Sequence, residues 1–163
     1  NPEESPHDFF NVGHTSTSIS LATGLAKARD LAGRRENIIA FIGDGSMSGG
    51  EALEGLNVAG EMQTNFIIVF NDNDQSIAEN HGGMYKEFHR LRETNGTAEN
   101  NLFRAMGLDY RYVADGNDCE ALIAAFRPSS STSIRRRERA TNSPRKTVRR
   151  GTTVCLLTSK RAR

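Results

Sequence analysis

Residues 38–76 read IIAFIGDGSMSGGEALEGLNVAGEMQTNFIIVFNDNDQS, in which two short apolar runs are separated by a helical pattern. The first run ends in Gly43-Asp44-Gly45, and the second, residues 66–70, ends in Asn71-Asp72-Asn73. Two buried strands joined by a crossover helix form a βαβ unit, and ligands bind at the carboxyl ends of its parallel strands. The stretch therefore predicts an α/β fold, with a parallel sheet flanked by helices and polar side chains gathered at one edge.

These polar side chains are suited to a metal-bound diphosphate. Mg²⁺ prefers about six oxygen ligands, commonly one or two carboxylates with phosphate and water. Asp44 offers a carboxylate, Asn73 a side-chain carbonyl, and the backbone at Gln75 can turn a carbonyl inward. Glycines at 43, 45, 49 and 50 permit close approach of the backbone to phosphate, and the helix expected from about residue 50 would direct its N-terminus to the same place. Asp72 remains open between a turn former and a partner of the metal ligands.

Three separated motifs resemble one family of thiamine diphosphate (ThDP) enzymes. GDG followed by an Asn after an apolar strand resembles the ThDP and Mg²⁺ motif of transketolases, 2-oxo acid dehydrogenases and 1-deoxy-D-xylulose-5-phosphate synthases. Residues 13–20, GHTSTSIS, and 71–77, NDNDQSI, resemble the GHSSTSIS and NDNxMSI of the deoxyxylulose-phosphate synthases. The resemblance covers roughly residues 9–126, and Gln75 departs from the Met often found there, at a position that would ligate through its backbone.

The resemblance implies a set of cofactor contacts and a reaction for the full enzyme. The residues carried over as cofactor-binding are Gly13, His14, Thr15, Asp44, Gly45, Ser46 and Asn73. The residues carried over as Mg²⁺ ligands are Asp44, Asn73 and Gln75, and no catalytic residue is assigned. The full enzyme, a homodimer, would decarboxylate pyruvate and add the two-carbon unit to glyceraldehyde 3-phosphate. A second domain would supply the Glu that helps to activate the cofactor, so we expect the isolated chain to be inactive.

The remaining pattern predicts further helices and strands. Helices are expected over 14–31, 51–62, 84–92, 97–106 and 119–126, and strands over 37–42, 66–70 and 108–113. The first strand is apolar at consecutive positions, as expected for a strand covered on both faces. The charges of the helix over 84–92 are interpreted as a solvated face. His81, in the polar loop 76–83, is interpreted as an exposed loop residue, with substrate contact as the alternative.

The net charge of +1 conceals two different kinds of sequence. Residues 127–163 contain 12 Lys and Arg against a single acid, Glu138, whereas residues 1–126 contain 9 Lys and Arg against 19 Asp and Glu. We therefore divide the chain into a partial ThDP-diphosphate and Mg²⁺ domain, 1–126, and a basic low-complexity tail, 127–163. The tail is expected to be disordered, since it shows no clear periodicity and has no aromatic residue.

Two interpretations of the tail remain open. It is a basic arm for nucleic acid, or it is translated out of frame. Where the family has an apolar strand and a KGKGY-like segment, codons chosen for residues 127 onward can encode SIVVHINTKKGEGYKLAEENREAW in the adjacent frame. On that second reading a strand of the sheet is lost, which predicts marginal stability or aggregation.

Composition sets limits on the function classes. No apolar run is long enough to span a membrane, and Cys119 and Cys155 do not form a metal-binding spacing, so we expect a cytoplasmic protein that does not bind membranes. Nucleic-acid binding is the less favoured class. The alternatives to a synthase-like fragment are the N-terminal subunit of a split transketolase, completed by a partner chain, and an inert gene fragment.

Overall fold

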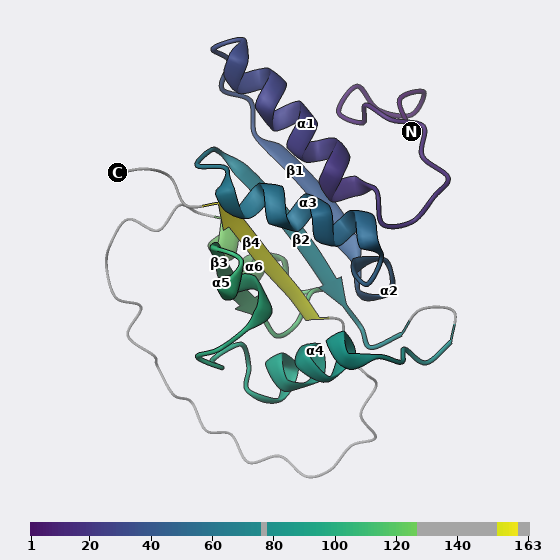
Figure 1. Ribbon diagram of the computed structural model, residues 1–163, viewed down its shortest axis with the longest axis vertical. Helices are drawn as coiled ribbons and strands as arrows, with labels where there is room; N and C mark the ends of the chain where they lie inside the picture. Colours follow the sequence, from purple (N-terminus) through teal and green to yellow (C-terminus); the bar gives the residue numbers. More distant parts are fainter. Residues whose placement is uncertain (76–77, 127–152, 160–163) are drawn as a thin grey trace.

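The computed structural model describes residues 1–75, 78–126 and 153–159. In these ranges the chain forms a four-stranded sheet with helices on both faces, which confirms the predicted α/β class (Figure 1). The elements, in order, are α1 (Ser18–Leu31), β1 (Ile38–Gly43), α2 (Asp44–Met47), α3 (Gly50–Glu61), β2 (Phe66–Asp72), α4 (Gly83–Glu93), α5 (Leu102–Ala105), β3 (Leu108–Val113), α6 (Cys119–Phe126) and β4 (Thr153–Ser159). No described helix is long and apolar enough to cross a membrane.

The sheet is mixed, with strand order β1-β2-β4-β3. β1 and β2 are parallel, with Gly43 paired to Asn71 at their carboxyl ends. β4 is antiparallel to both of its neighbours, so β3 runs in the same direction as β1 and β2. The three strands predicted from the pattern therefore share one direction, and the reversed strand between them was not predicted.

The expectation that the tail is disordered throughout is wrong for residues 153–159, which form β4. The run Val154-Cys155-Leu156-Leu157 is flanked by threonines, and all four side chains are buried. Apolar and β-branched residues favour a half-buried pleated strand, whatever the composition of the surrounding segment. Both interpretations of the tail depend on the basic, low-complexity sequence of residues 127–152. These residues lie outside the described ranges.

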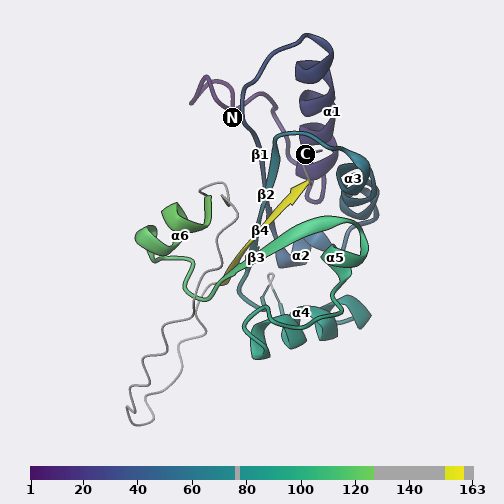
Figure 2. The same cartoon turned by 90° about the vertical axis from the view of Figure 1, so that its left-hand side faces the viewer.

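Helices cover the two faces of the sheet unequally. α1, α3 and α5 lie on one face and α6 lies on the other (Figure 2). The larger core lies on the first face, where Phe70, Phe88, Phe103 and Tyr110 form a cluster of ring contacts with centroid separations of 4.9–6.1 Å. A smaller core of four buried residues beneath α6 consists of Val69, Val113, Val154 and Leu156.

Several details depart from the sequence expectations. α1 begins at Ser18 rather than at residue 14, and only Leu102–Ala105 of the helix expected over 97–106 is helical. β1 is not covered on both faces, since Ile39 and Phe41 are 53% and 63% exposed while Ala40 and Ile42 are buried. It is also an edge strand of the sheet. The short helix α2 was not predicted, because its four residues are too few to show a period.

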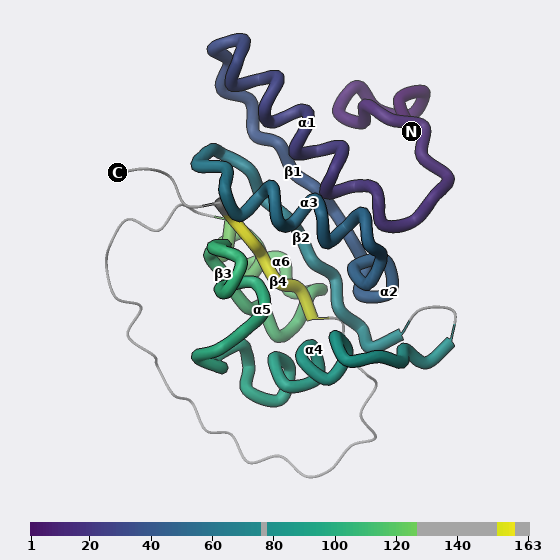
Figure 3. Tube along the Cα trace, in the orientation of Figure 1, coloured from purple at the N-terminus to yellow at the C-terminus, as the bar shows by residue number. Residues whose placement is uncertain are grey.

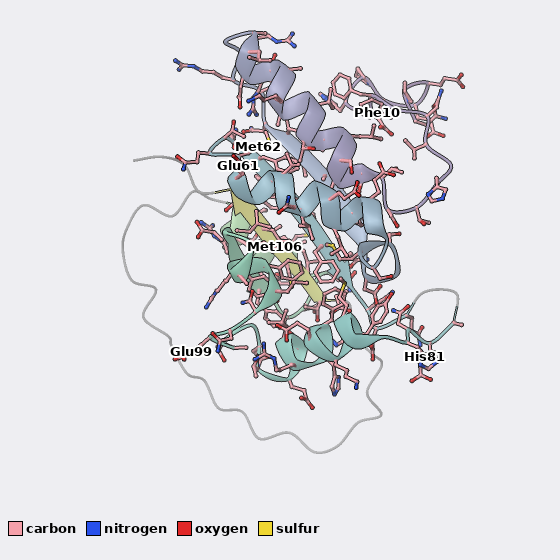
Figure 4. All side chains as sticks on the ribbon, viewed as in Figure 1. Phe10, Glu61, Met62, His81, Glu99 and Met106 are labelled. Atoms are coloured by element: carbon pink, nitrogen blue, oxygen red, sulfur yellow. The ribbon has the colours of Figure 1, made fainter. Side chains whose placement is uncertain are left out.

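The close approach of α3 to the segment before β3 requires glycine at position 60. A Cβ at Gly60 would lie 1.9 Å from the Met106 carbonyl oxygen, a backbone atom that cannot rotate away. Figure 4 labels Met106 together with Glu61 and Met62, the residues that follow Gly60 at the end of α3. The packing of these two segments therefore leaves no room for a side chain.

Gly60→Ala is expected to destabilise the protein by about 2 kcal/mol or more, because overpacking displaces backbone. The control is Gly24→Ala on α1, where a Cβ would meet no atom within 4 Å. That control is expected to stabilise by roughly 0.5–1 kcal/mol, the usual advantage of Ala over Gly in a helix. Thermal unfolding followed by circular dichroism measures both, and stabilisation by both variants would contradict the packing argument.

Candidate functional site

The carboxyl ends of β1 and β2 bring Asp44 and Asp72 to the same edge of the sheet. Gly43 pairs with Asn71, so the residues that follow in each strand are neighbours. Asp44 is 3% exposed and Asp72 is 2% exposed. Two buried carboxyl groups at adjacent strand ends form an acidic centre, as the βαβ pattern predicted.

The surroundings of Asp44 disfavour the ionised form of its carboxyl group. Asn80 donates a hydrogen bond from Nδ2 to Asp44 Oδ2 at 2.8 Å. Burial raises the pKa of the Asp44 carboxyl above its ordinary value, and the negative charge of Asp72 raises it further. Backbone N–H groups and the positive charge of Arg92 oppose this rise without cancelling it. The protein therefore does not fully offset the negative charge of an ionised Asp44, and a bound cation would do so.

The loop after β2 carries oxygen donors at the same edge of the sheet. Asn73 Oδ1 accepts a hydrogen bond from the Gln75 backbone N–H at 3.1 Å, and Asp74 has a φ of 62°. A non-glycine residue in the left-handed region carries backbone strain, which is common at ligand-binding loops. Gln75 is exposed and forms a β-bridge with Glu79. Residues 76 and 77 of the NDNDQSI motif lie outside the described residues.

The segment before α1 lies along a groove on the β1 side of the sheet. The groove has a volume of about 1210 Å³, and its lining includes Gly13, His14, Thr15 and Ser46. The segment that carries the first three of these residues, purple in Figure 3, leads into α1. A Cβ at Gly13 would meet no protein atom within 4 Å, so packing leaves space there for a ligand. His14 Nδ1 lies 2.6 Å from the Thr15 carbonyl oxygen.

A contact between Ser16 and Gly49 links this segment to the loop between α2 and α3. A Cβ at Gly49 would lie 2.1 Å from Ser16 Oγ, so the two residues touch only because position 49 is glycine. Ser16 has a φ of 73°, the second strained non-glycine backbone among the predicted cofactor motifs. The GHTSTSIS segment is therefore fixed against the residues that follow Gly43-Asp44-Gly45.

The predicted residues fall into two neighbouring groups. Gly13, His14, Thr15 and Ser46 line the groove, whereas Asp44 is buried at the strand end and Asn73 and Gln75 lie in the loop after β2. Gly45 follows Asp44 in α2. Among the described residues no three His, Cys, Asp or Glu side chains are arranged to hold a metal ion. The oxygen donors nevertheless fit a hard divalent cation that takes its other ligands from a diphosphate and water.

Two polar residues at this edge were not singled out from the sequence. Asn80 binds Asp44, and Arg92 of α4 binds Asp72 with Nη1 at 2.6 Å from both carboxylate oxygens. The helical period did contain a signal, because Arg92 follows the buried Phe88 by four residues and so lies on the same face. The interpretation of the α4 charges as a solvated face is wrong for Arg92, which is 17% exposed.

The remaining assignments concern Asp72, His81 and Tyr85. Asp72 acts as a turn former, since its Oδ1 accepts the Asp74 N–H at 3.1 Å, and its carboxylate pairs with Arg92. Its role as a partner of the metal ligands stays a prediction. His81 is exposed, as interpreted from the sequence, and it lies in the loop that precedes α4 (Figure 4). Tyr85 of α4 donates a hydrogen bond to Ser48 Oγ at 2.8 Å, which holds the start of α4 against the turn after α2.

Comparison with known proteins agrees with the motif assignment. A family model described as 1-deoxy-D-xylulose-5-phosphate synthase matches residues 1–100. A protein of Geobacter sulfurreducens named 1-deoxy-D-xylulose-5-phosphate synthase 2 is 62% identical over 81 residues, covering 50% of this chain and 13% of the relative. Similar proteins named 1-deoxy-D-xylulose-5-phosphate synthase occur in Desulfitobacterium hafniense, 56% identical over 89 residues (55% of this chain and 14% of the relative), and in Chlorobaculum tepidum, 38% identical over 161 residues (76% and 25%).

The chain thus spans only 13% to 25% of the length of these relatives. The matched residues include the GHTSTSIS segment, the GDG turn and the NDND loop, which are the three parts that form the site described above. The chain belongs to the 1-deoxy-D-xylulose-5-phosphate synthase family.

Proposed function

We propose that this chain holds the diphosphate and Mg²⁺ of ThDP for a 1-deoxy-D-xylulose-5-phosphate synthase reaction. The observation that carries the proposal is the buried, undercompensated Asp44 at the end of β1 beside the oxygen-rich Asn73 loop at the end of β2. Such a centre costs folding free energy unless a cation occupies it, and Mg²⁺ accepts this set of donors.

The residues divide the binding between them. Asp44 supplies a carboxylate oxygen to Mg²⁺, Asn73 its side-chain oxygen, and Gln75 its backbone carbonyl. Gly45 and Ser46 would contact the diphosphate, and Gly13, His14 and Thr15 would contact the cofactor from the groove side. The present hydrogen bond from the Gln75 N–H to Asn73 Oδ1 keeps that oxygen directed into the loop, while a second lone pair stays available.

The bound cofactor supplies the carbanion chemistry, and the residues of this chain bind and orient it. In the longer relatives we propose pyruvate and glyceraldehyde 3-phosphate as substrates, a homodimer as the assembly and the cytoplasm as the location. A second domain there would contribute the Glu that acts on the aminopyrimidine. We therefore propose cofactor binding as the contribution of the described residues to that reaction.

Calorimetric titration with ThDP tests this proposal. Binding is expected with Mg²⁺ present and is expected to be lost in EDTA, since Mg²⁺ would supply the positive charge that the Asp44 carboxylate and the diphosphate both require. Asn73→Ala should weaken binding about 10–100-fold, the usual effect of losing a group that orients or ligates a metal. Asn57→Ala, on the exposed side of α3, is the matched control and should bind as the wild type does. The proposal would be refuted if ThDP bound equally well with and without Mg²⁺, or if Asn73→Ala bound ThDP as tightly as Asn57→Ala.

A further inference from the structure

Arg92 connects α4 to both residues that flank Asn73. Its Nη1 lies 2.6 Å from each carboxylate oxygen of Asp72, and its Nη2 lies 2.7 Å from Asp74 Oδ1. The guanidinium is largely buried, and the Asp72 carboxylate is almost completely so. A planar guanidinium with two bonded carboxylates has a fixed orientation, which a lysine could not reproduce.

This arrangement has two effects on the acidic centre. It fixes the loop on both sides of Asn73, whose neighbour Asp74 is in the strained left-handed conformation. It also occupies both Asp72 oxygens, so Asp72 is committed to an internal ion pair although it lies beside Asp44. Asp44 is left as the carboxylate at this edge that has no arginine bound to it in the described structure.

We propose that Arg92 is a positioning residue that makes cation binding at this site depend on the diphosphate. A centre with one available carboxylate binds a divalent cation weakly by itself, because affinity rises with the number of charged ligands. The diphosphate must then supply the missing negative charge. Without Arg92, the Asp72 carboxylate would be released beside Asp44 and the Asp74 carboxylate in the loop that follows, so the cation would bind alone and the diphosphate would be repelled. This inference rests on the proposed function.

The test substitutes Arg92→Met and measures two affinities. The first is for Mn²⁺ alone, by electron paramagnetic resonance of the free ion, and the second is for ThDP at saturating Mg²⁺, by calorimetry. We expect Mn²⁺ to bind at least about tenfold tighter and ThDP at least about tenfold weaker than in the wild type. Lys86→Met removes one positive charge from an exposed position of the same helix and should change neither affinity.

A double variant separates the effect from a loss of folding. Arg92→Met with Asp72→Asn removes both charges of the buried pair and is expected to return the Mn²⁺ affinity toward the wild-type value. Near-ultraviolet circular dichroism of the tyrosines checks that each variant is folded. If Arg92→Met lowers both affinities together, or if the double variant retains the gain for Mn²⁺, the positioning role is refuted. Failure of the wild type to bind ThDP refutes the proposed function instead, because the measurement with Mn²⁺ alone does not require the cofactor.

Discussion

A chain that ends at residue 152 is expected to lose cooperative folding. β4 lies between β2 and β3, so its removal exposes the inner edge of both strands and separates β3 from the rest of the sheet. Val154, Cys155, Leu156 and Leu157 are each 5% exposed or less. Burying a large aliphatic side chain contributes about 1.5–3 kcal/mol, so the loss of several approaches the total stability of a small domain, about 5–15 kcal/mol.

Urea unfolding followed by far-ultraviolet circular dichroism measures this effect. The matched control is a chain that ends at Ser159, which retains all of β4 and should unfold with the midpoint of the whole protein. In the shortened chain we expect a broad transition with a reduced slope, together with aggregation through the unpaired edges. A sharp transition in the chain that ends at 152 would show that β4 is dispensable, and it would then support the view that the tail is foreign to the fold.

Asp44→Asn is expected to abolish Mg²⁺-dependent ThDP binding while it stabilises the unliganded protein. The amide keeps an oxygen that can accept the hydrogen bond from Asn80, but it removes the charge that burial and Asp72 disfavour. Loss of the carboxylate proposed as a Mg²⁺ ligand should weaken binding by about 100-fold or more. The expected gain in stability is about 0.5–2 kcal/mol, the range common for substitutions that relieve a functional site.

The pH dependence of stability shows whether Asp44→Asn acts by removing a charge or by changing the packing. Because the pKa of Asp44 is raised on folding, its favourable contribution is present below the ordinary carboxyl pKa and is lost as pH rises through the folded value. The stability difference between Asp44→Asn and the wild type should therefore be small at about pH 4 and larger at about pH 7. Denaturant unfolding at both values measures it. A difference that is the same at both would assign the effect to packing, and a stable variant that still binds ThDP with Mg²⁺ would rule out Asp44 as a ligand.

Much of the fold could be predicted from local patterns. β3 and α6 have the predicted bounds, and β1 and β2 differ by one or two residues at their ends. These elements are regular runs that include their own boundary signals, such as Asp118, whose Oδ1 accepts the Ala121 N–H at the start of α6. β4 could not be predicted in the same way, because its apolar run is short and its partners, β2 and β3, lie far away in the chain.

The site shows the same division between local and distant information. The motif residues Asp44 and Asn73 were found because each follows a strand and both are separated by a helix of the right length. Their environment depends on residues from another element: Asn80 reaches Asp44 from the loop before α4, and Arg92 reaches Asp72 from the end of that helix. The position at which an amphipathic helix packs on the sheet determines whether its arginine faces water or a carboxylate. The periodicity of the sequence does not predict that position.

The strand order has a consequence for the rate of folding. β4 pairs residues as distant in the chain as Phe70 and Cys155, while β2 and β3 cannot pair with each other across the place that β4 occupies. Closing such a long loop must precede the gain from pairing, so we expect this sheet to form slowly compared with sheets built from adjacent strands. During synthesis β2 and β3 exist before their common neighbour does, and over that interval the nascent chain would present unsatisfied strand edges to chaperones.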